Sequence, residues 1–176
     1  SDLTECIAAN TAIQIPQGTE ARFVENWEGA FVYEGIVYDH MRYRLRGANG
    51  RYQIPPSNPS TVAGKRHWRF RFNRGRHLEA RDKWGNLYPT KWRILNTDRL
   101  FGNRLDGNWG LGDEVNDIIW NANGVPSPFG HNFHWRVVSG PEEAPPGADG
   151  QYLGDFWGIV RAFENYDGHF LDAHGL

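Results

Sequence analysis

Two short segments of the chain alternate strictly between apolar and polar residues. Residues 41–46 read MRYRLR and residues 67–72 read HWRFRF. Successive side chains of a β-strand point to opposite faces of a sheet, so this period predicts two half-buried strands. If the strands share a sheet, their apolar sides join one core. The other face then carries up to five arginines, and Lys65 extends this polar set by one step. The arginines are Arg42, Arg44, Arg46, Arg69 and Arg71.

So many like charges on one face are unfavourable unless carboxylates or a bound anion neutralise them. Guanidinium groups suit phosphate because their donors match two oxygens at once. One interpretation is therefore a phosphate or polyanion site. The other is a solvated strand face with arginines paired to local acids. Residues 47–64 connect the two strands with little secondary-structure signal, and connections of that length are often functional or disordered.

The rest of the pattern predicts an α+β fold, with one main helix packed on a twisted, mostly antiparallel sheet. Residues 30–39 read as a hairpin that turns at Glu34-Gly35. Residues 91–96, 131–139 and 152–164 read as strands, and the last, a near-continuous apolar run, suits a central strand. Leu111, Val115, Ile118, Ile119 and Ala122 share one face at helical spacing. A short helix is expected over residues 167–174.

Composition bounds these choices. The 176 residues suit one domain with a real core, and the net charge of −2 argues against electrostatic binding of nucleic acid. The single cysteine permits neither an internal disulfide nor a cysteine-based zinc site. No apolar run is long enough to cross a membrane, and no signal peptide opens the chain. Seven histidines raise the question of a metal site, but no site is assigned because no cysteine or carboxylate completes a ligand set.

Five strings in order resemble the spore coat protein H (CotH) family of atypical protein kinases. The strings are FVYEGIVYDHMRYRLRG (residues 31–47), GKRHWRFRFNRG (64–75), KWRILN (91–96), NGVPSP (123–128) and GQYLGDFWGIVRAFENYDG (150–168). The resemblance covers residues 30–176, which it identifies as an N-terminal kinase lobe, and it leaves residues 1–29 as an extension. It implies an exported or cell-envelope enzyme that transfers the γ-phosphoryl group of ATP, with magnesium, to serine or threonine of a surface or coat protein.

The resemblance also implies roles for individual residues. Kinase lobes hold the nucleotide phosphates through a strand lysine paired with a helix glutamate, so Lys65 and Glu114 are the candidates for these positions. Arg44 and Arg46 are candidates for phosphate contacts. Gly47 and Gly50, with the two residues between them, are candidates for a covering turn. Glu164 and Asn165 follow the last strand, where the kinase hinge meets adenine. The alternatives for the two glutamates are a helix-dipole carboxylate for Glu114 and a strand-end salt bridge for Glu164.

Two departures from kinase patterns qualify this function. The chain has no G-x-G-x-x-G loop, which the family also lacks in standard form. It also has no H-R-D string and no D-F-G string. Residues 155–158, DFWG, resemble the latter but fall within a predicted strand and are interpreted as structural. In the family, the acidic residues that hold magnesium and accept the hydroxyl proton lie in a second lobe, which this sequence does not contain. We therefore expect an incomplete nucleotide site that is inactive alone.

Two rival functions come from other classes. A non-catalytic β-rich domain would bind glycans by stacking sugars on an exposed tryptophan, with Trp84, Trp92 and Trp109 as candidates, although most tryptophans belong to a core. A structural or assembly protein would self-associate through the lobe face left uncovered, because exposed apolar patches drive association. Glycan binding independent of ATP and magnesium distinguishes the first, and concentration-dependent oligomers distinguish the second.

Overall fold

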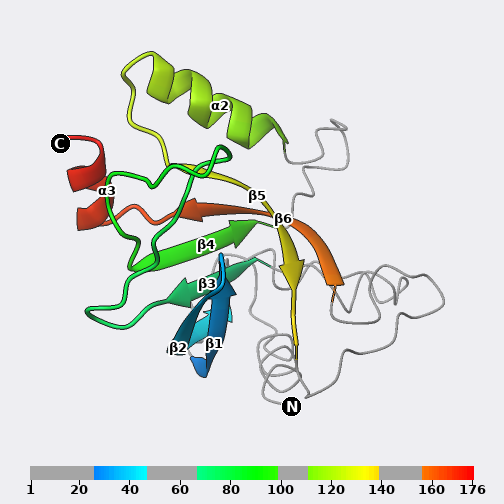
Figure 1. The fold of residues 1–176 in the computed structure, drawn as a ribbon. Coiled ribbons are helices and arrows are strands. Elements are labelled where there is room, and N and C mark those ends of the chain that lie inside the picture. The colour runs from blue at the N-terminus through cyan, green and yellow to red at the C-terminus, as the bar shows by residue number, and fades with distance from the viewer. Residues whose placement is uncertain (1–25, 47–66, 99–110, 139–155) are drawn as a thin grey trace, which may run out of the picture.

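The computed structural model describes residues 26–46, 67–98, 111–138 and 156–176. These residues form a six-stranded sheet with the order β1-β2-β3-β4-β6-β5, in which every neighbouring pair is antiparallel (Figure 1). Two helices accompany the sheet. The elements are β1 (Trp27–Tyr33), β2 (Ile36–Leu45), β3 (Trp68–Arg71), β4 (Ile94–Asp98), α2 (Leu111–Ala122), β5 (Gly130–Arg136), β6 (Phe156–Glu164) and α3 (Gly168–Ala173).

The alternating segments pair as their pattern predicts. In the β2–β3 register, Tyr43 lies opposite Phe70, while Arg44 lies opposite Arg69. The aromatic side chains therefore share one face and the arginines share the other, as expected of neighbouring strands of period two. The β1–β2 hairpin turns where Glu34-Gly35 was expected. Both turn residues have positive φ, 50° and 75°, which matches the twist of the strands that they join.

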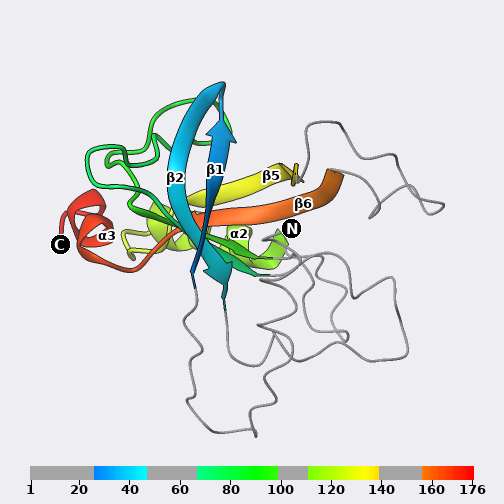
Figure 2. The ribbon, with the colours of Figure 1, turned by 90° about the horizontal axis from the view of Figure 1, so that it is seen from below.

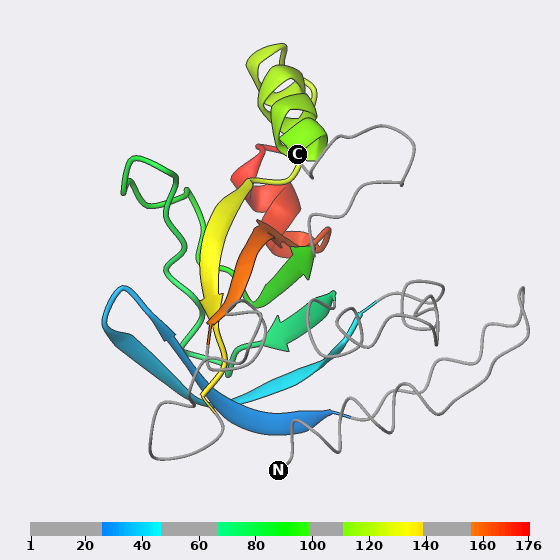
Figure 3. The same cartoon turned by 90° about the vertical axis from the view of Figure 1, so that its right-hand side faces the viewer.

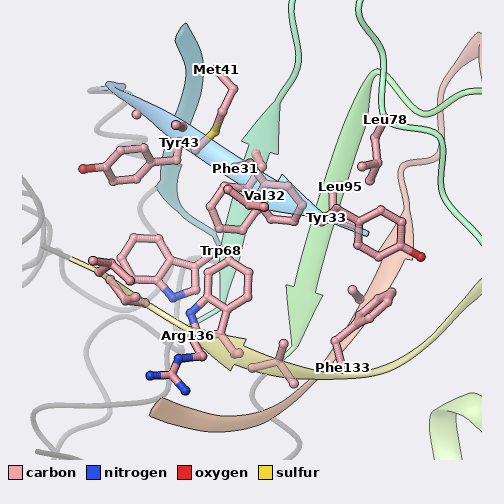
Figure 4. Close-up of a pocket in the computed structure, with 18 of the residues that line it drawn as sticks. Phe31, Val32, Tyr33, Met41, Tyr43, Trp68, Leu78, Leu95, Phe133 and Arg136 are labelled. Carbon is pink, nitrogen blue, oxygen red and sulfur yellow. The ribbon is translucent and has the colours of Figure 1, made fainter. Parts of the chain in front are cut away.

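The sheet curls into a half-barrel whose concave side holds the core (Figure 3). The β1–β2 hairpin crosses the β5–β6 pair (Figure 2), and the edge strands β1 and β5 meet through aromatic rings. The ring centroids of Phe31 and Trp135 lie 5.9 Å apart, and those of Tyr33 and Phe133 lie 5.6 Å apart. An apolar cavity of about 840 Å³ remains between these edges (Figure 4). The fully buried core members are Tyr38, Met41, Trp68, Phe70, Phe72, Leu78, Ala80, Trp92, Leu95 and Ala162.

Helix α2 forms where it was predicted but does not pack as predicted. Val115, Ile118 and Ile119, on its apolar side, are about half exposed. The helix is attached instead through a polar residue, because Asp117 bonds with Arg161 of β6 and with Ser127. A buried arginine requires a carboxylate partner, and this requirement orients the helix. Figures 1 and 3 show α2 beyond β5 and β6, away from the β1–β2 hairpin.

The remaining elements differ from the sequence predictions mainly at their ends. Strand β1 begins inside the predicted N-terminal extension, and β4 begins later than predicted because Trp92 pairs with Leu78 in a separate bridge. Strand β6 lies between β4 and β5, which confirms its prediction as a central strand. Helix α3 is capped by the Asp167 side chain, which accepts a hydrogen bond from the His169 amide. Among the described residues, no helix is long and apolar enough to span a membrane.

Candidate functional site

Three arginines gather on the convex face of the sheet, opposite the core. We call Arg46, Arg69 and Arg161 the arginine cluster. Arg46 directly follows β2, Arg69 belongs to β3, and Arg161 belongs to β6. The cross-strand registers explain the grouping, because Arg69 lies opposite Asn96, and Asn96 lies opposite Phe163. Residues directly opposite one another share a face, so this row places Phe163 on the arginine side of the sheet.

Phe163 organises the cluster by stacking. The guanidinium carbon of Arg46 lies 4.9 Å from the centroid of the Phe163 ring, and that of Arg161 lies 4.6 Å from it. The ring is buried. Cation–π contacts at such distances hold guanidinium groups in place without neutralising their charge.

Arg69 ties β3 to the chain that follows β6. Its Nε donates to Asn96 Oδ1 at 3.2 Å, and its Nη2 donates to Asn165 Oδ1. The Asn96 amide group donates to the same Asn165 oxygen at 3.2 Å. This network places the Arg69 guanidinium beside the end of the last strand, where the resemblance puts a nucleotide.

Arg161 is neutralised within the protein. It forms an ion pair with Asp117 and is only 7% exposed. Burial lowers the pKa of Arg161, and Asp113, Asp98 and Glu114 oppose that shift. Glu114 therefore lies near enough to Arg161 to act on it electrostatically.

Arg46 differs from Arg161 in one respect that decides the chemistry of the site. No carboxylate among the described residues forms a salt bridge with it. Burial lowers the pKa of Arg46, Asp98 opposes that shift, and Arg161 adds to it. A partly buried guanidinium without a salt bridge gains from an anion that reaches it, so Arg46 is the member of the cluster that suits a phosphate group.

The predicted site residues fall into four groups, the last of which is Glu164 alone. Arg46 and Asn165 lie in or against the arginine cluster, and Arg44 lies directly opposite Arg69 on the same face. Glu114 lies on α2, near Arg161. Gly47, Gly50 and Lys65 lie outside the described residues.

Glu164 faces away from the cluster. Its buried Oε1 accepts hydrogen bonds from the Phe129 amide at 2.8 Å and pairs with His174 Nε2 at 2.9 Å. Its own amide donates to Phe129 O at 3.0 Å. The side chain therefore joins the end of β6 to β5 and α3, which corresponds to the strand-end ion pair considered as its alternative role.

The sequence did not single out Arg161, Phe163 or Asn96 as site residues. A usable signal was the arginine in the middle of the apolar run of β6, because arginine is rarely buried without a partner. The pairing of Asn96 with Asn165 spans 69 residues of sequence and carries no local signal.

In the described part of the chain, no group of three His, Cys, Asp or Glu side chains suits a metal ion. No family model, curated protein or solved structure matches this chain.

The buried Glu164 carboxyl predicts a pH dependence of stability. Burial raises its pKa, although bonds from Phe129 and His174 oppose the shift. A carboxyl with a raised folded-state pKa stabilises the fold below the ordinary glutamate pKa of about 4.3, and this contribution is lost as the pH rises. Glu164→Gln lacks this titration. In thermal denaturation from pH 4 upward, the melting temperature of the native chain should therefore fall relative to that of Glu164→Gln as the pH rises. A difference independent of pH would contradict this account.

Proposed function

We propose that this chain is the nucleotide-binding lobe of a CotH-like atypical protein kinase and that the arginine cluster binds the triphosphate of ATP. The observation that carries the proposal is Arg46, a partly buried guanidinium stacked on Phe163 without a carboxylate partner in the described part of the chain. Phosphate oxygens supply the charge and the acceptors that such a group lacks.

The neighbouring groups extend this site along the sheet. Arg69 reaches Asn165, so a nucleotide that contacts Arg46 would also lie beside the end of β6. Arg44 lies opposite Arg69 and supplies a further guanidinium on the same face. This arrangement supports a site that extends from the phosphates toward Asn165, one of the two residues assigned to the hinge.

Lys65 and Glu114 are the proposed lysine–glutamate pair. Lys65 precedes His67 by two positions, and the His67 ring lies 3.3 Å from Asp98, a neighbour of both Arg46 and Arg161. Glu114 acts on Arg161 from α2. Asp98 and Glu114 thus both act on Arg161, and the pairing of Lys65 with Glu114 rests on the resemblance.

The complete reaction is transfer of a phosphoryl group to serine or threonine of a surface or coat protein. Magnesium, when bound, neutralises charge on the transferred group. We assign no ligand for it, because the described residues hold no suitable group of side chains. The contribution proposed for these residues is to hold and orient the phosphates.

Two further parts of the proposal concern partners and location. The exposed apolar side of α2, formed by Val115, Ile118 and Ile119, suits self-association or contact with another protein. An extracellular or cell-envelope location follows from the resemblance alone.

Calorimetry tests the proposed function. ATP with magnesium should bind this chain, while adenosine should bind far more weakly because phosphate contacts supply most of the interaction. Affinity should also fall as salt is raised, since the contacts are ionic. Lys65→Ala should weaken ATP binding. Equal affinity for ATP and adenosine would contradict a phosphate site, and no binding of ATP would remove the proposal.

A further inference from the structure

A tryptophan is exposed at the tip of the excursion between β3 and β4. Trp84 lies in a turn at residues 82–85, and 78% of its surface is exposed. Single exposed apolar residues are common, but an indole of this size is more often buried. The surroundings of Trp84 therefore determine whether it has a role.

Hydrogen bonds within the turn fix the backbone on both sides of Trp84. Asp82 Oδ1 accepts hydrogen bonds from the Trp84 amide at 2.8 Å and from the Asn86 amide at 2.9 Å. Arg81 Nη1 donates to Gly85 O at 2.7 Å, and Gly85 has the positive φ that the turn requires. Lys83 Nζ lies 5.6 Å from the indole centroid. Because the backbone is held, only the side-chain rotation of Trp84 has to be restricted when a ligand stacks on the indole.

A polar cavity of about 360 Å³ adjoins this turn. Three separate segments line it: the β1–β2 turn, residues 81–85, and the start of β5. Lys83 and Gly85 belong to the lining, and the exposed Trp84 between them lies beside the cavity without lining it. Its volume falls within the range of about 300–1,000 Å³ that is usual for small-molecule sites.

Two buried polar atoms of the lining residues lack a partner, His131 Nδ1 and Asn132 Oδ1. His131 Nδ1 has no hydrogen-bond partner in the structure, although it is buried. Burial lowers the pKa of His131, which favours the neutral ring. A neutral imidazole carries one donor and one acceptor, and because Nδ1 is enclosed, the ring can offer a ligand only its other nitrogen, Nε2.

The charges around the cavity balance. Glu34 and Asp82 supply two carboxylates, and Arg81 and Lys83 supply two cations. Asp82 and Arg81 are already occupied by hydrogen bonds within the turn. A lining with equal numbers of positive and negative side chains favours a neutral ligand rich in hydroxyl groups over an anion or a cation.

We propose that this cavity and Trp84 form a binding site for a neutral saccharide, with one sugar ring stacked on the indole and hydroxyl groups directed to His131 and Glu34. The site lies at the start of β2, while Arg46 follows its end. It is therefore separate from the proposed nucleotide site, and either can fail without the other.

Titration of the full chain with neutral hexasaccharides tests this site. The probes are cellohexaose, chitohexaose, xylohexaose and maltohexaose, added without nucleotide or magnesium. We expect at least one to bind, and Trp84→Ala to weaken that binding at least about tenfold, which corresponds to about 1.4 kcal/mol. Trp84→Phe should retain part of the affinity, because it preserves an aromatic surface.

Leu87→Ala is the matched control, since Leu87 is exposed on the same excursion but lies outside residues 81–85, the segment that borders the cavity. It should bind the probe as the native chain does, and Trp84→Ala should bind ATP as the native chain does. The proposal is overturned if no hexasaccharide binds, or if Trp84→Ala binds as well as the native chain. Equal losses in Leu87→Ala and Trp84→Ala would also overturn it.

Discussion

Asp117→Asn should destabilise the fold by about 3–5 kcal/mol, because it leaves the charge of Arg161 buried without its partner. The Arg161 side chain is 7% exposed and Asp117 is 20% exposed, so water does little to replace the lost carboxylate. Asparagine keeps the size of the side chain and a carbonyl oxygen for Ser127. Urea denaturation measures the effect as a lower midpoint at unchanged slope.

Two variants make this result specific. Asp39→Asn removes a carboxylate from an exposed ion pair with Arg76 and should cost no more than about 1 kcal/mol. Combining Asp117→Asn with Arg161→Met should recover part of the stability, because a buried apolar side chain can replace a buried charge. A small effect of Asp117→Asn would show that α2 is not held to β6 by this pair.

Arg46→Gln should weaken ATP binding about 10- to 100-fold. A hydrogen bond to a charged group contributes about 1.5–3 kcal/mol, and each 1.4 kcal/mol is a factor of ten in affinity. The same substitution should leave the free energy of unfolding unchanged or higher, because Arg46 is partly buried beside Arg161 and has no salt bridge with a described carboxylate. Calorimetry and urea denaturation of one preparation measure both quantities.

Arg76→Gln controls for the loss of one positive charge. Arg76 donates to Val37 O and pairs with Asp39, so it lies by the start of β2. Arg76→Gln should bind ATP with an affinity within about twofold of that of the native chain, because salt screens the effect of a distant charge. If both variants lost affinity equally, net charge rather than the arginine cluster would explain binding.

The parts of the fold that follow local rules could be predicted. The period of two in residues 41–46 and 67–72 fixed which side chains share a face, and Glu34-Gly35 fixed the hairpin. The environment of α2 could not be predicted in this way. Its apolar spacing indicated a buried face, whereas the contact that holds it comes from Asp117 to a strand 44 residues later.

The candidate site was predictable from β2 but not from β6. Alternation placed Arg44 and Arg46 on one face, and the structure adds that Arg46 stacks on Phe163. Phe163 lies in an apolar run whose pattern does not distinguish the two faces of the strand. Only the strand order, with β6 beside β4, brings it and Arg161 to the arginine side.

The most direct measurement follows the side-chain Nε–H signals of the arginines by nitrogen-15 NMR while ATP with magnesium is added. The account predicts that the signals of Arg46 and Arg69 shift in parallel with saturation, while the signal of Arg76 stays in place. Shifts confined to Arg76 and other distant arginines, or no shift at Arg46 on saturation with ATP, would contradict it.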